Sequence, residues 1–499
     1  MYRSKFFYPC LLVLLWFVMM YIVNPFGNFP INDDWQYARP VWYLINKGYY
    51  FSPDAYSPII ISQVFLGSLF CLPGGFSFDA LRISTMVLSL TGVLIFYLLL
   101  LKSTRNQKLS FLGALLLVAN PFYCSLSISF MTDVPFVAFS IVSAYFFFCA
   151  IESDKQLHII LATVFAIVAT LIRQFGIVIP IAFGLVSIIR NRPKFIKCWK
   201  YLLPAIITGI ILESGFLWLK YIGSELKPYY GVSIIDFIKR PGNLFANAQT
   251  RGSLLLLYSG FFLLPLLLYT TWSIWFRTSK RQKIGIFVFV LIFIPGLVIW
   301  CQQFPCRNIL TTYGIGPRTL KGMMELVYPN PDFPHAILLL LQIIAFIGAI
   351  LLLINFGKII IDIIHSCYHR EYTKTTMQQM FTVFFFIGYA ALMFVPDNFF
   401  DRYFLIFIVL SAILILSGMP ENVKIRQPFY IISCIITIAM GIFSAAITHD
   451  YMAWNRTRWQ GIDYLTKDLK VSPHKMDGGY EFNGWAIGVS NQASIDKGK

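Results

Sequence analysis

Residues 6–38 read FFYPCLLVLLWFVMMYIVNPFGNFPINDDWQYA, an apolar run followed by a short loop and two adjacent carboxylates. The run at 6–23 carries no charged side chain, and about 20 such residues cross a bilayer as a helix. Asp33 and Asp34 follow directly. Neighbouring carboxylates repel each other, and one of them tends to take up a proton. Packing gives no reason for such a pair, so the stretch predicts a membrane helix with a functional site at its end.

The composition extends this interpretation to the whole chain. Of the 499 residues, 58% are hydrophobic and 13% are charged, and the mean hydropathy is +0.69. Soluble domains carry about 25% charged residues, so the soluble classes are excluded. The first segment starts with Arg3 and Lys5 but lacks a small-residue cleavage site, and we expect it to remain as a signal anchor. The chain is predicted to be an all-α polytopic membrane protein.

Thirteen apolar segments have about the length that a membrane helix needs. They run near 6–23, 81–101, 109–128, 134–151, 159–172, 175–190, 201–221, 253–276, 284–301, 335–356, 378–395, 403–418 and 428–447. The stretch 159–190 could form one long tilted helix or two short helices that meet at Arg173-Gln174, and the distribution of basic residues favours two. The stretch 109–128 is read as one span bent at Pro121, because neighbouring groups in a membrane protein can satisfy the carbonyl that a proline frees.

The basic residues predict the orientation. With two helices in 159–190, the Lys and Arg residues of five short loops fall on the side of Arg3 and Lys5; these loops are 102–108, 190–200, 277–283, 358–374 and 424–426. The positive-inside rule then predicts a cytoplasmic amino terminus and an extracytoplasmic carboxyl terminus. Orientation therefore explains much of the net charge of +17, and no nucleic-acid partner is expected.

This topology places the long connections outside. They are residues 24–80, 222–252, 302–334 and 448–499. Within the first of them, 37–44 and 59–70 have apolar residues at helical spacing, which is typical of interfacial helices along the membrane plane and equally of simple packing under the loop. We expect a transmembrane domain at 1–447 and a small extracytoplasmic C-terminal cap at 448–499.

Ionisable residues recur at the outer ends of separate helices. They are Asp33, Asp34, Asp133, Arg173, Asp401 and Arg402. Such groups are costly at membrane depth and mark functional sites. Taken alone, each residue also has a simpler explanation. The helix dipole favours an acid such as Asp133 at the start of a helix, and Arg402 would be an interfacial anchor. Arg173 would be a loop residue, and the Asp pair would be a solvated turn. Their joint occurrence predicts one site.

The order of these motifs resembles the GT-C superfamily of membrane glycosyltransferases. The resemblance is to the branch of protein O-mannosyltransferases and lipid A aminoarabinose transferases, and it covers residues 1 to about 418. Its motifs are NDDWQYA at 32–38, DAYSPIIISQVF at 54–65, NPFYCSLSISFMTD at 120–133, LIRQFG at 171–176 and DRYFLIF at 401–407. The chain departs from many relatives, which have Asp-Glu in place of Asp33-Asp34 and a basic residue before two prolines in place of Tyr56-Ser57-Pro58.

The resemblance implies transfer of a hexosyl or pentosyl unit from a polyprenyl-phosphate donor. Inverting displacement would use Asp33 as the base, while Asp34 would hold the acceptor or the geometry. A carboxylate suits the base role, and Arg suits phosphate because its planar fork matches phosphate oxygens. The acceptor would be a lipid, a glycan or a protein of the cell envelope, as in lipopolysaccharide or protein glycosylation. The resemblance also implies a multi-pass protein of the bacterial plasma (inner) membrane.

The same resemblance implies a substrate-binding set. Arg402 and Arg173 would face the phosphate, Asp133 would support the acceptor side, and Tyr37 and Tyr403 lie in the same motifs. No cofactor is certain. A divalent cation on the carboxylate pair stays open, since such ions take oxygen ligands.

Other classes of protein predict other patterns. A secondary transporter places ionisable residues at mid-membrane, where Glu213 is the one candidate. A polysaccharide polymerase or ligase would use Arg307, Arg318 and Lys321 in the loop 302–334. A non-catalytic assembly factor has no use for an acidic pair together with phosphate-reading arginines. We therefore favour an integral-membrane glycosyltransferase that works at the outer face.

Overall fold

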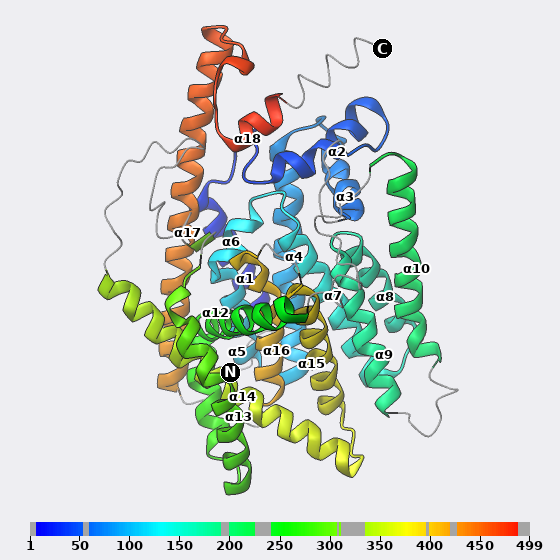
Figure 1. The fold of residues 1–499 in the computed structure, drawn as a ribbon, viewed down its shortest axis with the longest axis vertical. Coiled ribbons are helices and arrows are strands. Elements are labelled where there is room, and N and C mark those ends of the chain that lie inside the picture. The colour runs from blue at the N-terminus through cyan, green and yellow to red at the C-terminus, as the bar shows by residue number, and fades with distance from the viewer. Residues whose placement is uncertain are drawn as a thin grey trace.

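The computed structural model describes residues 6–52, 59–190, 199–224, 241–306, 309–310, 335–395, 399–419 and 427–487. In these ranges all regular secondary structure is helical (Figure 1). This confirms the predicted all-α fold.

The first half of the chain supplies the helices α1 to α10. In chain order they are α1 (Phe7–Val23), α2 (Asp34–Lys47), α3 (Ile61–Cys71), α4 (Phe78–Thr104), α5 (Gln107–Ala119), α6 (Pro121–Ser127), α7 (Asp133–Ser153), α8 (Gln156–Thr170), η1 (Gln174–Ile177), α9 (Val178–Arg190) and α10 (Trp199–Tyr221). The second half continues with α12 (Pro241–Trp275), α13 (Lys280–Trp300), α14 (His335–His369), α15 (Lys374–Met393), η6 (Asp401–Phe404), α16 (Leu405–Ser417) and α17 (Gln427–Asp463). The short helices α18 (Tyr480–Phe482) and η9 (Asn483–Ile487) lie in the tail.

Each of the thirteen predicted apolar segments contains a helix. In the described part of the chain, eight helices are long and apolar enough to cross a membrane, or nine if the bent pair α5–α6 is one span. The predicted number of thirteen spans therefore stays a prediction, while the polytopic class is confirmed.

In the segments 159–190 and 109–128 the helix is interrupted where the sequence predicted a break. In 159–190 the chain forms two helices, because α8 ends at Thr170 and α9 begins at Val178. In 109–128, α5 and α6 meet at an angle of 60°. The Asn120 side chain accepts hydrogen bonds from the backbone N–H groups of Phe122 (2.9 Å) and Tyr123 (3.3 Å). Pro121 has no N–H to pair, so an Asn cap is the usual way to start a helix at such a bend.

The helix α16 forms the centre of the bundle. All of its residues are buried, and it contacts α4, α12 and α15. Beside it, α12 and α14 cross where Gly260 meets Gly348. A Cβ on Gly260 would lie 2.3 Å from the backbone nitrogen of Ala349. Small residues allow such close approach of helices in membranes. The tightly packed centre fixes the position of η6, which directly precedes α16.

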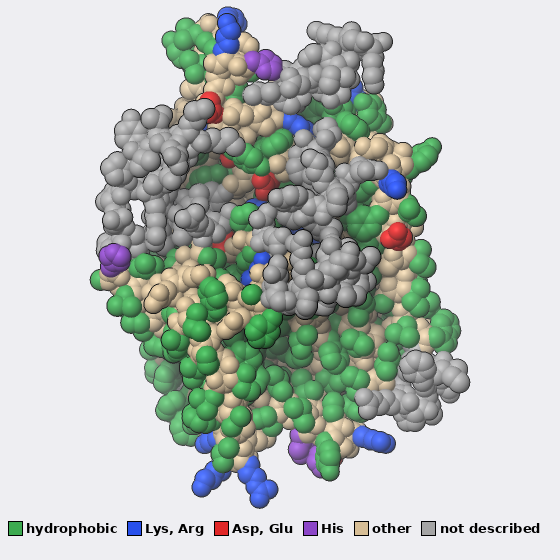
Figure 2. Space-filling view, in the orientation of Figure 1, with side chains coloured by type: hydrophobic (Ala, Val, Ile, Leu, Met, Phe, Trp, Pro, Cys, Tyr) green, Lys and Arg blue, Asp and Glu red, His purple; other side chains and the backbone are tan. Residues whose placement is uncertain are grey.

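Side-chain types divide the molecule along its long axis. Figure 2 shows hydrophobic side chains over the broad lower part of one face, with Lys, Arg and His side chains at its lower end. The helices α2 and α18 lie at the opposite end (Figure 1). Which end faces the cytoplasm stays a prediction.

The C-terminal part is one long helix followed by a short folded tail. The helix α17 runs along one side of the bundle (Figure 1) and passes through residue 447. The part of the expected cap that packs on the first loop is therefore residues 464–487, which we call the cap. It contacts α2 through η9.

Candidate active site

Four of the predicted site residues meet at one point. Nη2 of Arg402 lies 3.2 Å from Oδ2 of Asp33. Nη2 of Arg173 lies 2.8 Å from Oδ1 of Asp133. The Nε of Arg402 lies 3.9 Å from Oδ2 of Asp133, so Arg402 joins the two pairs. The structure thus brings together four charged groups that are far apart in the sequence.

Each of these groups sits at a helix end. Asp33 directly precedes α2, and Asp133 is the first residue of α7, where a negative charge is favoured by the helix dipole. Arg173 lies in the turn between α8 and η1, and Arg402 lies in η6 ahead of α16. Helix ends from four separate parts of the fold therefore position the site.

Aromatic rings support the two arginines. The Tyr403 ring lies 5.5 Å from the guanidinium carbon of Arg173 and 5.6 Å from that of Arg402, within the range of cation–π attraction. Arg173 also donates from Nε to the hydroxyl of Thr132 at 2.7 Å. Tyr37 is buried, and the charges of Asp33 and Arg402 act on its phenol. Burial raises the pKa of Tyr37 well above its usual value, so this hydroxyl stays protonated at neutral pH.

Exposure distinguishes the two carboxylates of the cluster. The side chain of Asp33 is 25% exposed, whereas that of Asp133 is 2% exposed. Both arginines are largely buried. Two carboxylates balance two guanidinium groups, which lowers the cost of keeping these charges together at this depth. Asp33 is the acid that an outside molecule can reach.

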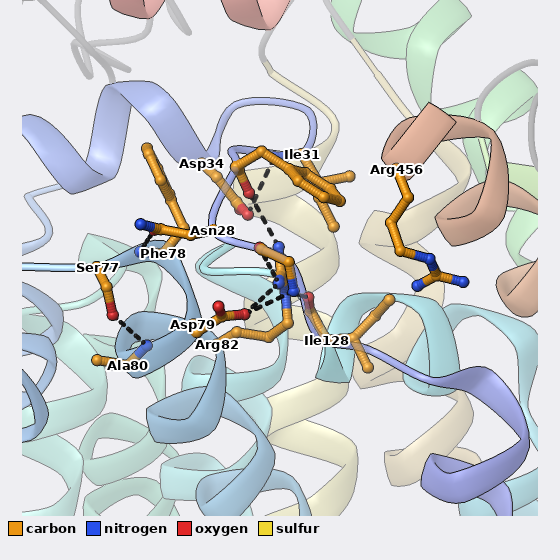
Figure 3. A network of polar contacts seen from close by, with 12 residues as sticks. Asn28, Ile31, Asp34, Ser77, Phe78, Asp79, Ala80, Arg82, Ile128 and Arg456 are labelled. Carbon is orange, nitrogen blue, oxygen red and sulfur yellow. Dashed lines mark hydrogen bonds and ion pairs between the residues drawn. The ribbon is translucent and has the colours of Figure 1, made fainter. Parts of the chain in front are cut away.

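Asp34 lies apart from this cluster. Its side chain is buried, and Oδ2 accepts a hydrogen bond from the backbone N–H of Ile31 at 3.3 Å (Figure 3). Burial raises the pKa of Asp34 to about 8, although the nearby charge of Arg82 opposes the shift. We therefore expect a mostly protonated Asp34 at neutral pH. The two adjacent acids therefore have different surroundings.

Arg82 in α4 is a residue that the sequence motifs did not reveal. It donates from Nε to the Ile128 carbonyl (2.7 Å), from Nη1 to the Gly27 carbonyl (2.8 Å) and from Nη2 to the Phe29 carbonyl (3.0 Å), and it pairs with Asp79 at 3.1 Å (Figure 3). These bonds tie the first outer loop to the start of α4. An arginine in the opening turns of an apolar span is the signal that would have found it.

The acidic pair does not fit a divalent cation. Asp33 turns to Arg402 and Tyr480, and Asp34 turns to the backbone of Ile31 near Arg82. Within the described ranges, no group of three or more His, Cys, Asp or Glu residues is arranged to hold a metal ion.

The cap reaches the site through Tyr480. Its hydroxyl donates to Oδ1 of Asp33 at 3.0 Å and accepts from the Gln36 side chain at 2.8 Å. The next residue, Glu481, pairs with Arg458 of α17 at 2.9 Å. No local pattern in the sequence connects Tyr480 with Asp33, because 447 positions separate them.

A large apolar cavity lies between α12, α13, α14 and α15, with a volume of about 780 Å³. Gly252 and Phe394 belong to its wall. Next to Gly252, Arg251 donates to a backbone carbonyl of α15 and lies 5.1 Å from the ring of Phe399. Phe399 in turn contacts Tyr403, with ring centroids 5.6 Å apart. Two aromatic side chains thus connect the cavity wall with the charged cluster.

Comparison with known proteins gives a family match and a looser structural one. Residues 61–218 match the family described as Dolichyl-phosphate-mannose-protein mannosyltransferase. Two solved structures of ArnT from Cupriavidus metallidurans resemble the chain at a TM-score of 0.42, one bound to undecaprenyl phosphate (12% identity) and one in the apo state (11% identity). Each alignment covers 96% of this chain and 83% of the ArnT chain. No sequence match was found among curated proteins.

The matched region contains Asp133 and Arg173 of the charged cluster, together with the helices α3 to α9 and most of α10. It includes three of the motifs on which the resemblance to membrane glycosyltransferases rests, in whole or in part. The family match supports that resemblance over residues 61–218, the part of the chain that it covers.

Proposed function

We propose that this enzyme transfers a sugar from a polyprenyl-phosphate donor to an acceptor at the outer face of a bacterial plasma membrane. The observation that carries the proposal is the cluster in which Arg402 pairs with Asp33 and Arg173 pairs with Asp133. It combines an accessible carboxylate with two buried cations. Those are the two kinds of group that sugar transfer from a lipid phosphate needs.

Asp33 is the proposed base. It takes the proton from an acceptor hydroxyl or amine as that group attacks the anomeric carbon of the sugar. The bond between this carbon and the phosphate oxygen breaks, and the polyprenyl phosphate leaves with the electron pair. One displacement of this kind inverts the configuration at the anomeric carbon. Partial exposure of Asp33 supports the role, because the acceptor arrives from outside.

The two arginines are the proposed phosphate site. The Nε of Arg402 has a long ion-pair contact with Asp133, at 3.9 Å, but no hydrogen bond among the described residues, so a phosphate oxygen would complete its bonding. Arg173 uses Nε for Thr132 and Nη2 for Asp133, and a guanidinium group has five N–H donors in all. Asp133 would hold both arginines in place beneath the phosphate, in addition to supporting the acceptor side. Asp34 would hold the geometry of the loop.

The lipid tail needs an apolar surface near the phosphate. The cavity between α12 and α15 offers one, and its wall approaches the cluster through Phe399 and Tyr403. The description of the matched family names a dolichyl-phosphate sugar, which supports a donor of the same lipid-phosphate class. The proposed partners are thus a polyprenyl-phosphate-linked sugar, the bilayer, and a lipid, glycan or protein acceptor.

The rival functions find less support. Glu213, the deepest candidate for a transport site, is exposed on α10, which has few buried residues, so it does not line an interior path. Arg307, Arg318 and Lys321, on which a polymerase or ligase would depend, lie outside the described residues.

The test compares Asp33→Asn with Asp34→Asn in purified protein. Removal of a general base lowers the transfer rate by roughly 10²- to 10⁴-fold, so we expect that loss in Asp33→Asn, with donor binding kept because the arginines remain. Asp34→Asn should transfer at a rate near that of the wild type, since Asp34 is already mostly neutral. Wild-type transfer by Asp33→Asn would refute the proposed base.

A further inference from the structure

The Asp33 carboxylate is held at both oxygens by different parts of the chain. Oδ2 lies 3.2 Å from Nη2 of Arg402, and Oδ1 accepts from the Tyr480 hydroxyl at 3.0 Å. Arg402 lies in η6, directly ahead of the central helix α16, and Tyr480 lies in the cap. The orientation of Asp33 therefore depends on both.

The proton positions in this contact follow from the partners. The Gln36 amide donates to the Tyr480 oxygen at 2.8 Å, so the hydroxyl proton is directed to Asp33. An ionised carboxylate is an acceptor only. Burial and the negative charge of Asp33 both raise the pKa of Tyr480, so its hydroxyl keeps the proton that it donates.

The cap is also held in place by contacts that do not involve the Tyr480 hydroxyl. Glu481 accepts from the backbone N–H of Asn32 at 3.1 Å and pairs with Arg458 at 2.9 Å. Trp485 stacks on Phe76 with ring centroids 5.4 Å apart and an interplanar angle of 12°. These contacts do not involve Asp33. The Tyr480 hydroxyl therefore adds a bond to the site beyond those that dock the cap.

This hydroxyl also prevents an unproductive arrangement. A guanidinium group prefers to bind a carboxylate through two parallel bonds, one to each oxygen. Without a second partner, Asp33 would turn both oxygens to Arg402, and neither would face the acceptor. The Tyr480 bond keeps Oδ1 away from Arg402. A carboxylate oxygen has two lone pairs, so Oδ1 still has one for the proton of the acceptor.

We propose that Tyr480 is a positioning residue for sugar transfer, which holds the Asp33 carboxylate with one oxygen turned to the acceptor and so makes the cap part of the active site. This inference rests on the proposed role of Asp33. Tyr480 touches neither donor nor acceptor in this role, and it acts through Asp33 alone.

The experiment uses Tyr480→Phe in the full-length protein, with Tyr464→Phe as the matched control. Phe keeps the ring that packs edge-on against Trp35, at 5.6 Å between centroids, and removes only the hydroxyl. Tyr464 lies in the same tail and is 56% exposed. We expect kcat of Tyr480→Phe to fall about tenfold, the order expected when one hydrogen bond to a charged group is lost. The donor Kd and the KM for the acceptor should stay at wild-type values, and Tyr464→Phe should behave like the wild type.

A double variant separates positioning from a structural role. Because Tyr480 acts through the Asp33 carboxylate, Tyr480→Phe should cause no further loss in an Asp33→Asn background. A tenfold further loss there would overturn the inference, as would an unchanged or increased kcat of Tyr480→Phe alone. If Asp33→Asn itself transfers normally, the proposed function fails instead. The two failures are therefore distinguishable.

Discussion

At the scale of single residues, one peptide bond separates two acids with different properties. Asp33 is partly exposed and paired with Arg402, whereas Asp34 is buried and has a pKa raised to about 8. Repulsion between adjacent carboxylates is relieved when one of them holds a proton. Burial, which outweighs the opposing charge of Arg82, favours Asp34 as the protonated member. The pair then presents one negative charge, on the side where the arginines lie.

Donor binding or turnover should also depend on the guanidinium group of Arg402. Lysine in its place keeps the positive charge but loses the planar fork. We expect Arg402→Lys to weaken donor binding or lower turnover by roughly 10- to 100-fold, since a bond to a charged group contributes about 1.5–3 kcal/mol. Expression should stay normal, because a lysine is tolerated at the same depth. Isothermal titration with donor and a transfer assay would measure the two effects.

The control for this exchange is Arg277→Lys, at an exposed arginine that follows α12. It should change neither donor binding nor turnover. Equal activity of Arg402→Lys and wild type would instead favour the interpretation of Arg402 as a simple membrane anchor.

At the scale of helices, sequence patterns located the elements but not all of their contacts. Apolar length predicted the helices, and Asn120 with Pro121 predicted the bend between α5 and α6, because both signals are local. Counting basic residues predicted two helices in 159–190 and so the position of Arg173. The bond from Tyr480 to Asp33 spans 447 positions. Docking of that kind depends on surface shapes that composition and periodicity do not contain.

The sequence also could not predict that the side chains of Asp33 and Asp34 have different surroundings. Both acids stand at the start of α2, and the pattern alone treats them alike. Arg82 binds the carbonyls of Gly27 and Phe29 and thereby sets how the loop enters α2. The two side chains then point to different surroundings.

The contact between η9 and α2 allows a test of whether sugar transfer needs the docked cap. A Cβ on Gly484 would lie 2.4 Å from the ring of Trp35, and Trp35 is buried. Gly484→Ala should therefore displace the cap, lower transfer at least as much as Tyr480→Phe, and speed proteolysis of the tail. Gly461→Ala in α17 is the control, because no other atom lies within 4 Å of its added Cβ. Unchanged transfer by Gly484→Ala would show that the cap is dispensable.

At the scale of the whole molecule, the site stands between two very different surroundings. On one side the cap and the first loop present polar groups to Asp33. On the other side, the cavity of about 780 Å³ between α12 and α15 is almost wholly apolar. A donor that joins a long hydrocarbon chain to a charged sugar phosphate would span this boundary. The acceptor would come from the polar side.

The cavity gives a test that uses the length of the donor lipid. Ala391 belongs to the cavity wall, so Ala391→Trp would fill part of the space that the tail needs. We expect the KM for a long-chain donor to rise about tenfold, the order of an overpacking cost of about 1–3 kcal/mol. The KM for a donor with a short lipid should stay unchanged, because its tail does not reach the cavity. Ile210→Trp, on an exposed face of α10, adds the same ring away from the cavity and should leave both values alone. Equal increases for both donors would show that Ala391→Trp disturbs the phosphate site itself, and no increase for either would place the tail elsewhere in the bundle.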